Sequence, residues 1–311
     1  MADVVEVRLG TRGSPLALWQ ADWVTAELEA LGVRVQRVLI ETTGDVRTGP
    51  IGQLAAQGVF TKEIQRALLD RQIDLAVHSL KDLPTEVVPG LALAAVPARA
   101  ALGDVLISRD GVKFADLPQA AIVGTGSLRR RSQLLAARPD LQLQDVRGNV
   151  DTRLRKLQEG QFDALVLAEA GLRRLGLAEH IVEIFDKRVM LPAVGQGALG
   201  LETRVDDQVL RELLQQLNHP ATRAAVDAER SLLAALRGGC LAPVGAWGRL
   251  DDEQQLVLDA VVLSLDGRQV LRGTAVGNAA DAVTIGRSVA EKLLEQGAAE
   301  LIAQIRSGQD R

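Results

Sequence analysis

Short apolar runs alternate with helical segments over most of the chain, and this alternation is the strongest constraint on its fold. Over residues 4–9 apolar and polar side chains alternate, with Val5, Val7 and Leu9 apolar, which is typical of a strand. Ser14 and Pro15 then fit the cap and first position of a helix that Gly32 would end. A second strand is expected over residues 35–41. Strands and helices in this order predict βαβ units and a largely parallel sheet.

The alternation continues along the chain and changes near its end. Further strands are expected at 74–77, 104–108, 121–123, 141–146, 163–168 and 199–202, and helices at 61–70, 127–137 and 152–159. After a helix around 227–236, three strands follow without intervening helices, at 245–250, 255–265 and 270–276, and then a helix over 285–304. The last part of the chain is therefore expected to be α+β.

This order of elements predicts three domains. The fold class is α/β, with two α/β domains of the periplasmic-binding-protein type, a cleft between them, and a small α+β C-terminal domain. We expect crossovers near residues 97–104 and 191–198. The expected domains are 1–98 plus 198–216, 103–193 and 220–311.

Composition excludes several classes of partner. The 36 basic and 40 acidic residues give a net charge of −4, and there are few aromatic residues, so we expect no nucleic-acid binding. No apolar run reaches about 18 residues and the start of the chain has no signal pattern, so we expect a cytoplasmic protein without membrane contact. One cysteine and three scattered histidines favour neither an internal disulfide nor a metal site.

Arginines gather where strands lead into helices. Ser127 precedes Arg129 and Arg130 at the start of one helix, and Arg147 and Arg153 flank the start of the next. Helix N-termini carry partial positive charge, so each arginine there costs about 0.3–1 kcal/mol unless an anion is present. Free N–H groups and guanidinium groups would bind such an anion jointly. The sequence therefore predicts an anion site at the carboxyl edge of the sheet.

Two other interpretations of these arginines remain open. They could be solvated surface residues, or pair with nearby aspartates and glutamates. Two α/β domains with an anion-binding cleft would also suit a non-enzymatic anion-binding protein of the periplasmic type. The glycine-rich segment 124–127 lacks the complete motifs of nucleotide-phosphate loops.

Asp82 and Cys240 are the two residues for which we predict a chemical role. Pro84 biases Leu83 away from helix, so Lys81 and Asp82 are expected on an extended loop at a strand end. There Asp82 would act as an acid–base group, although it could simply cap the loop. Cys240 follows two glycines and could expose a thiolate that holds a covalent group, or be a small buried apolar residue.

Nine segments match, in order, the motifs of one family. They are TRGSPLALWQ (11–20), GVFTKEIQRALL (58–69), AVHSLKDLP (76–84), VGTGSLRRR (123–131), RGNVDTRL (147–154), LAEAGLRRLG (167–176), LPAVGQGALG (191–200), NHP (218–220) and GGCLAP (238–243). In these segments, which span nearly the whole chain, the sequence resembles the porphobilinogen deaminases, also called hydroxymethylbilane synthases.

The resemblance implies an activity, a cofactor and a fold. Four porphobilinogen molecules are joined head to tail into linear hydroxymethylbilane, with loss of ammonia at each step through an azafulvene. The chain grows on a dipyrromethane cofactor, one per protein, held by a thioether to the loop cysteine. Each pyrrole ring brings an acetate and a propionate, which gives the arginines a chemical purpose. The family fold has two α/β domains and a third that carries the cysteine, and its members are monomers.

The resemblance also assigns residues. Asp82 matches the catalytic aspartate, and Cys240 the cysteine that carries the cofactor. The implied cofactor contacts are Lys81, Asp82, Ser127, Arg129, Arg130 and Arg153. The implied substrate contacts are Arg12, Ser14, Lys62, Arg147, Arg153, Arg174 and Gln196. One position departs from the family: Gln57 stands where a lysine is frequent, so we expect no charge contact from that position.

Overall fold

The computed structural model describes residues 6–42, 61–239 and 242–309, and it divides into two compact units. The first comprises Met1–Arg99 and Ala198–Arg223, and the second Ala100–Gly197 and Ala224–Arg311. The chain thus leaves the first unit and returns to it, as the two expected crossovers imply. The borders of the three predicted domains remain a prediction.

The first unit is built on a five-stranded sheet with the order β2-β1-β3-β10-β4. Strands β1, β2 and β3 are parallel, whereas β10 is antiparallel to both of its neighbours. The strands are β1 (Glu6–Thr11), β2 (Arg34–Leu39), β3 (Leu75–Ser79), β4 (Leu91–Ala95) and β10 (Leu199–Arg204), and the helices are α1 (Pro15–Ala30), α4 (Lys62–Leu69) and α8 (Gln208–Gln215).

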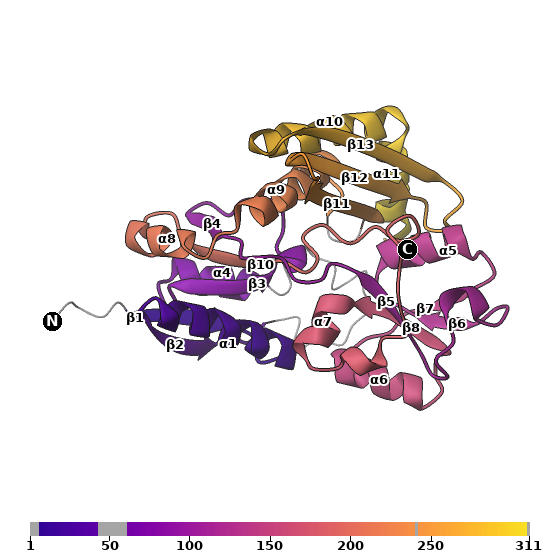
Figure 1. The fold of residues 1–311 in the computed structure, drawn as a ribbon, viewed down its shortest axis with the longest axis horizontal. Coiled ribbons are helices and arrows are strands. Elements are labelled where there is room, and N and C mark those ends of the chain that lie inside the picture. Colours follow the sequence, from indigo (N-terminus) through magenta and orange to yellow (C-terminus); the bar gives the residue numbers. More distant parts are fainter. Residues whose placement is uncertain (1–5, 43–60, 240–241, 310–311) are drawn as a thin grey trace. The chain divides into compact units, whose positions relative to one another are not determined.

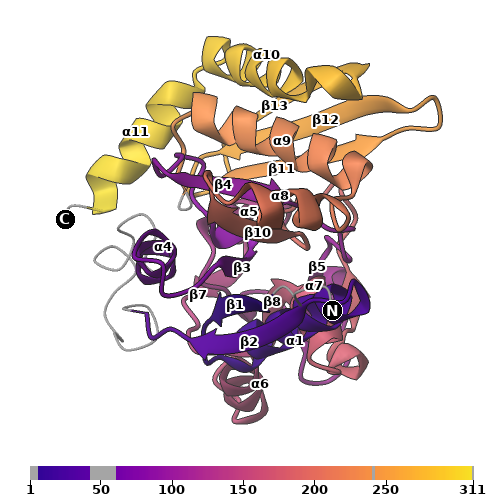
Figure 2. The ribbon, with the colours of Figure 1, turned by 90° about the vertical axis from the view of Figure 1, so that its left-hand side faces the viewer.

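Helices pack against both faces of this sheet. Helices α1 and α8 pack on one face, where Leu28 and Leu214 meet Leu9. Helix α4 covers the other face through Leu68, which packs with Ala76, and Figure 2 shows α4 and α1 on opposite sides of β1 and β3. As predicted, Pro15 begins α1, and the Ser14 hydroxyl accepts a hydrogen bond from the N–H of Ala17.

The second unit contains another five-stranded sheet, ordered β7-β6-β8-β5-β9. Apolar side chains pack on both faces of this sheet. Along β5, Leu106 packs on the face covered by α5, and Val105 and Ile107 pack on the face covered by α6 and α7. The strands are β5 (Asp104–Ser108), β6 (Ile122–Gly124), β7 (Gln142–Gln144), β8 (Ala164–Ala168) and β9 (Glu183–Ile184), and the helices are α5 (Leu128–Ala137), α6 (Val150–Gln158) and α7 (Glu169–Arg174).

The end of the second unit is an antiparallel sheet, β11-β12-β13, covered by helices. Its strands are β11 (Val244–Leu250), β12 (Gln255–Leu263) and β13 (Val270–Asn278), and the helices are α9 (Pro220–Ala235), α10 (Ala282–Glu295) and α11 (Ala298–Gln309). Figure 1 shows α10 along β12 and β13, against which it packs. The predicted α+β character is therefore confirmed.

Each five-stranded sheet is largely parallel, as predicted, with one reversed strand: β5 runs antiparallel to β8, and β10 runs antiparallel to β3. Both reversed strands follow an expected crossover, but local patterns do not reveal their direction. The structure corrects the expected elements in two ways. Strands β4 and β9 and helices α7 and α8 were not predicted, and α7 begins without a side-chain cap. The final helix is divided at Gly297, whose φ of 99° is incompatible with a helix.

Candidate active site

A cavity opens in the first unit. Several of the residues around it are polar, and three of them were predicted as site residues. The lining residues are Arg12, Ser14, Leu16, Ala17, Gln20, Thr61, Ile64, Val77, His78, Ser79 and Asp82.

The parallel pairing of two strands explains why distant residues meet here. Strand β1 pairs with β3 in parallel, with Leu9 opposite Leu75. Both strands therefore end at the same edge of the sheet, where loops gather to form ligand sites. The loop after β1 carries Arg12 and Ser14, and the segment after β3 carries Asp82. These three predicted residues line one cavity.

The segment that carries Asp82 differs from the expected extended loop. Residues Leu80–Asp82 form one turn of 3₁₀ helix, closed by a hydrogen bond from the N–H of Leu83 to the carbonyl of Leu80. Burial of the Leu80 side chain favours this turn, which leaves Lys81 half-buried and Asp82 exposed. Leu83 itself is extended, with a ψ of 119°, as Pro84 requires.

The cavity wall also contains polar groups that the sequence analysis did not select. Gln20 of α1 donates a hydrogen bond from Nε2 to Oγ of Ser79 at 2.8 Å. Next to it, His78 and Glu202 form a buried pair, described below. The local signal for His78 and Ser79 was their position within the family segment AVHSLKDLP (76–84).

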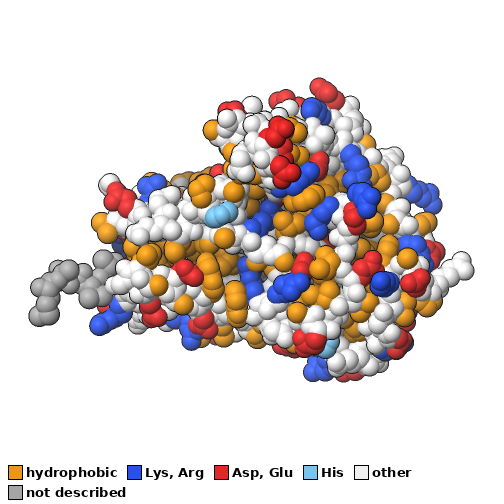
Figure 3. All heavy atoms as spheres, in the orientation of Figure 1, with side chains coloured by type: hydrophobic (Ala, Val, Ile, Leu, Met, Phe, Trp, Pro, Cys, Tyr) orange, Lys and Arg blue, Asp and Glu red, His pale blue; other side chains and the backbone are white. Residues whose placement is uncertain are grey.

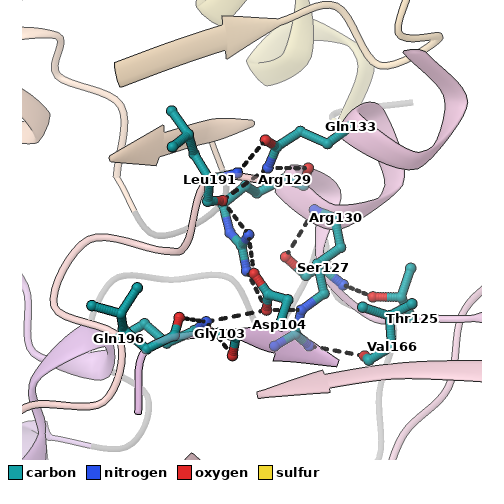
Figure 4. A network of polar contacts seen from close by, with 11 residues as sticks. Gly103, Asp104, Thr125, Ser127, Arg129, Arg130, Gln133, Val166, Leu191 and Gln196 are labelled. Atoms are coloured by element: carbon teal, nitrogen blue, oxygen red, sulfur yellow. Dashed lines mark hydrogen bonds and ion pairs between the residues drawn. The ribbon is translucent and has the colours of Figure 1, made fainter. Parts of the chain in front are cut away.

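In the second unit, a buried ion cluster anchors the start of α5 (Figure 4). Arg129 Nη1 lies 2.7 Å from Oδ2 of Asp104, and Arg130 Nε lies 2.8 Å from its Oδ1. Asp104 is fully buried, and the arginines are 4% and 6% exposed. Gln196 is also buried and donates from Nε2 to Oδ1 of Asp104 at 3.1 Å. Ser127 caps the helix, as its hydroxyl accepts from the N–H of Arg130.

This cluster holds more positive than negative charge. Burial alone would raise the pKa of the Asp104 carboxyl, but Arg129 and Arg130 lower it far below its usual range, so the carboxylate is ionised. Two guanidinium groups and one carboxylate leave a net charge of +1 in a buried position. Burial and the neighbouring Arg129 lower the pKa of Arg130, although Asp104 opposes this effect. An anion nearby would therefore be stabilised.

Further arginines of the second unit surround this cluster less tightly. Desolvation and the charge of Arg130 lower the pKa of Arg153 to about 10, and its Nε donates to the carbonyl of Gly148 at 2.8 Å. Burial lowers the pKa of Arg174 to about 10, and its Nη2 donates to the carbonyl of Gly197 at 2.9 Å. Arg147 is partly exposed and pairs with Asp145 at 2.9 Å. All three lie at loops or helix ends of one unit.

The remaining predicted site residues have different positions. Lys62 is exposed at the first position of α4 in the first unit. Cys240 and Gln57 lie outside the described residues. Among the residues that the structure describes, no three histidine, cysteine, aspartate or glutamate side chains group as metal ligands, and no helix is long and apolar enough to cross a membrane. On the face drawn in Figure 3, basic and acidic side chains are interspersed.

Comparison with known proteins identifies the family. Residues 7–212 match the family model "Porphobilinogen deaminase, dipyromethane cofactor binding domain", and residues 223–295 match "Porphobilinogen deaminase, C-terminal domain". The chain belongs to the porphobilinogen deaminase family. A porphobilinogen deaminase of Desulforudis audaxviator is 54% identical, covering 97% of this chain and 99% of that protein. One of Geobacter metallireducens is 47% identical, covering 96% and 95%. A Salmonella typhimurium periplasmic binding protein with high arginine specificity is 13% identical, with a TM-score of 0.39, covering 69% of this chain and 92% of that one.

The residues of the second unit fit the cofactor that this porphobilinogen deaminase model names. Two linked pyrrole rings with an acetate and a propionate each form a polyanion. The cluster at α5 has a net charge of +1, and Arg153 and Arg174 have lowered pKa values, so negative charge would stabilise all of them. The buried Nε of Arg129 has no hydrogen-bond partner among the described residues. The charge of the donor set is therefore right for a dipyrromethane.

Proposed function

We propose that this chain is a hydroxymethylbilane synthase, a transferase of tetrapyrrole and haem biosynthesis. It joins four porphobilinogen molecules head to tail into linear hydroxymethylbilane and releases ammonia at each step. The single observation that supports this most strongly is that Arg12, Ser14 and Asp82 line one cavity. A carboxylate, a guanidinium and a hydroxyl at one sheet edge suit a substrate that has two carboxylates and becomes cationic during reaction.

Asp82 acts on the charge that develops during each addition. Loss of the substrate amine leaves positive charge that spreads onto the pyrrole nitrogen. Asp82 is exposed at the cavity, so its carboxylate can accept a hydrogen bond from that N–H and stabilise the charge. A carboxylate lowers the activation barrier of the addition most when it is already held in position before the substrate reacts. The 3₁₀ turn, anchored by the buried side chain of Leu80, holds Asp82 in this way.

The arginines bind the carboxylates of the pyrrole rings. A guanidinium can form two parallel hydrogen bonds with one carboxylate, which orients a ring as well as attracting it. When bound, the dipyrromethane supplies the free pyrrole α-carbon on which the product chain grows. We propose Cys240 as its covalent attachment site, and Lys81, Asp82, Ser127, Arg129, Arg130 and Arg153 as its contacts. The proposed substrate contacts are Arg12, Ser14, Lys62, Arg147, Arg153, Arg174 and Gln196.

Further proposals concern the assembly, location and domains of the protein. It works as a monomer, which is the expectation for the family, and in the cytoplasm. It binds no nucleic acid, since its net charge is −4. The boundaries proposed for its domains are 1–98 plus 198–216, 103–193 and 220–311. The third of these includes Cys240 and therefore presents the cofactor.

Intact mass spectrometry tests the proposal directly. The purified protein is weighed beside a Cys240→Ser variant, before and after incubation with porphobilinogen. We expect the wild type, but not the variant, to carry or acquire the mass of two linked pyrrole units. A wild-type protein that stays at its polypeptide mass after incubation would contradict the enzyme assignment. That result would favour the non-enzymatic anion-binding protein, which needs neither Asp82 nor a modified cysteine.

A further inference from the structure

A buried histidine lines the Asp82 cavity and has no part in the function proposed above. His78 lies near the end of β3 and is 5% exposed. Its side chain contributes to the wall that also contains Arg12 and Asp82. The imidazole of a histidine in such a wall can both accept and donate a proton.

The ring of His78 is held from behind by a carboxylate. Its Nε2 lies 3.0 Å from Oε2 of Glu202, which is 5% exposed on the neighbouring strand β10. In the register of these strands His78 is opposite Gly200, so Glu202 is its diagonal neighbour on the same face. The two residues are 124 positions apart in sequence.

Helix α4 completes the arrangement and fixes the direction of the hydrogen bonds. Gln65 donates from Nε2 to Oε1 of Glu202 at 3.0 Å and to Oε2 at 3.3 Å. Glu202 is then an acceptor toward both of its neighbours, so the proton of the His78 ring lies on Nε2. A neutral ring with Nε2–H has its lone pair on Nδ1. This is the nitrogen that remains for an occupant of the cavity.

We propose that His78, oriented by Glu202, is a second acid–base group of this cavity. The proposal rests on the synthase function. In each addition the C–N bond of the substrate ammonium breaks, and its electron pair leaves with nitrogen as ammonia. Nδ1 of His78 then accepts the proton of the attacked pyrrole α-carbon, as that C–H bond breaks and its electron pair returns to the ring. Glu202 stabilises the imidazolium that forms, and Asp82 stabilises the ring cation. The departing ammonia takes up the proton from Nδ1, which restores the neutral ring.

A purely structural role would also explain the contact with Glu202, and one substitution separates the two roles. In His78→Gln the amide can still donate a hydrogen bond to Glu202, but it cannot transfer a proton. We expect kcat to fall by about 100-fold or more, the size typical of general acid–base catalysis. Assembly of the cofactor mass on apoenzyme, followed by intact mass, should slow as well, while the melting temperature stays unchanged. His180→Gln, at the partly exposed His180, is the matched control and should behave as wild type.

Nuclear magnetic resonance of histidine nitrogens gives a readout that needs no turnover. The chain has three histidines, so variants assign their signals. We expect the nitrogen signals of His78 to show its proton on Nε2 and the lone pair on Nδ1. Wild-type kcat in His78→Gln, or a permanent imidazolium in the wild type, would overturn the proposal. If His78→Gln does not fold, the nitrogen signals of His78 in the wild type test the proposal instead. A wild type that never consumes porphobilinogen would instead refute the synthase function.

Discussion

Two loops of the second unit look alike in sequence and differ in structure. Each joins a strand to a capped helix with arginines near its start, namely Ser127 before α5 and Asn149 before α6. At α5, Arg130 is 6% exposed and bound to Asp104. At α6, the Arg147 side chain is 34% exposed, and Arg153 donates to a backbone carbonyl. The same motif thus builds a fixed interior charge in one place and a more accessible charge in the other.

The difference shows that an arginine motif does not by itself reveal which side chains are available to a ligand. The availability of the α5 arginines is decided by a buried carboxylate on β5, because Asp104 binds Arg129 and Arg130. The α5 pair is therefore held in place by Asp104 and offers a fixed positive charge to the proposed cofactor, whereas we propose that the α6 arginines bind substrate carboxylates. Each prediction below tests this difference between the α5 and the α6 arginines.

The largest effect is expected from removing the buried carboxylate. Asp104→Asn leaves two buried guanidinium groups without a counter-charge, which should lower the free energy of unfolding by about 3–5 kcal/mol. Asp145→Asn removes the partner of Arg147 and is the matched control, with an expected loss of at most about 1 kcal/mol. Denaturant unfolding measures both. Equal losses would mean that the two loops do not differ as described.

Acid should weaken the α5 cluster selectively. The pKa of Asp104 is lower in the folded protein than in the unfolded chain, where it is about 4. The carboxylate therefore contributes fully to the free energy of unfolding above pH 4, and this contribution is lost as the pH falls below 4. Between these two pKa values the loss from this one group is about 1.4 kcal/mol per pH unit. Unfolding measured from pH 6 to pH 3 should show the gap between wild type and Asp104→Asn narrowing below pH 4. A constant gap would contradict the assigned ionisation.

Substitution at α6 should change binding without changing stability. If Arg153 binds a substrate carboxylate as proposed, Arg153→Gln removes a charge-assisted hydrogen bond worth about 1.5–3 kcal/mol, so KM should rise about 10-fold or more. The unfolding free energy should stay within about 0.5 kcal/mol of wild type. Arg155→Gln, on the same helix and 68% exposed, is the control and should change neither quantity. A large loss of stability in Arg153→Gln would place this arginine with the structural pair.

The smallest effect is expected from salt. Exposed charges are screened over about 8–10 Å at physiological ionic strength, whereas buried pairs are screened much less. KM for porphobilinogen should therefore rise modestly with added potassium chloride, and less in Arg153→Gln than in wild type. The unfolding free energy difference between wild type and Asp104→Asn should hardly respond. Identical salt dependence of KM in both proteins would remove Arg153 from the contacts that attract substrate.

Local chemistry made much of the fold predictable from sequence alone. The cap of α1 at Ser14, the strand at 104–108 and the antiparallel strands of the last part depend on neighbours within a few residues, and the structure contains them. The family motifs also pointed to Arg12, Ser14 and Asp82, which the parallel pairing of β1 and β3 brings to one cavity.

Contacts between distant segments were decided only by the tertiary structure. Asp104 meets Arg129 across 25 positions, and His78 meets Glu202 across 124. Both pairings depend on β5 and β10, the strands that enter their sheets in reverse after a crossover. A charged residue in an apolar strand signals that a buried partner must exist, since an unpaired buried charge is very costly. Which residue that partner is follows from strand order and direction, and these are set by packing of the whole unit.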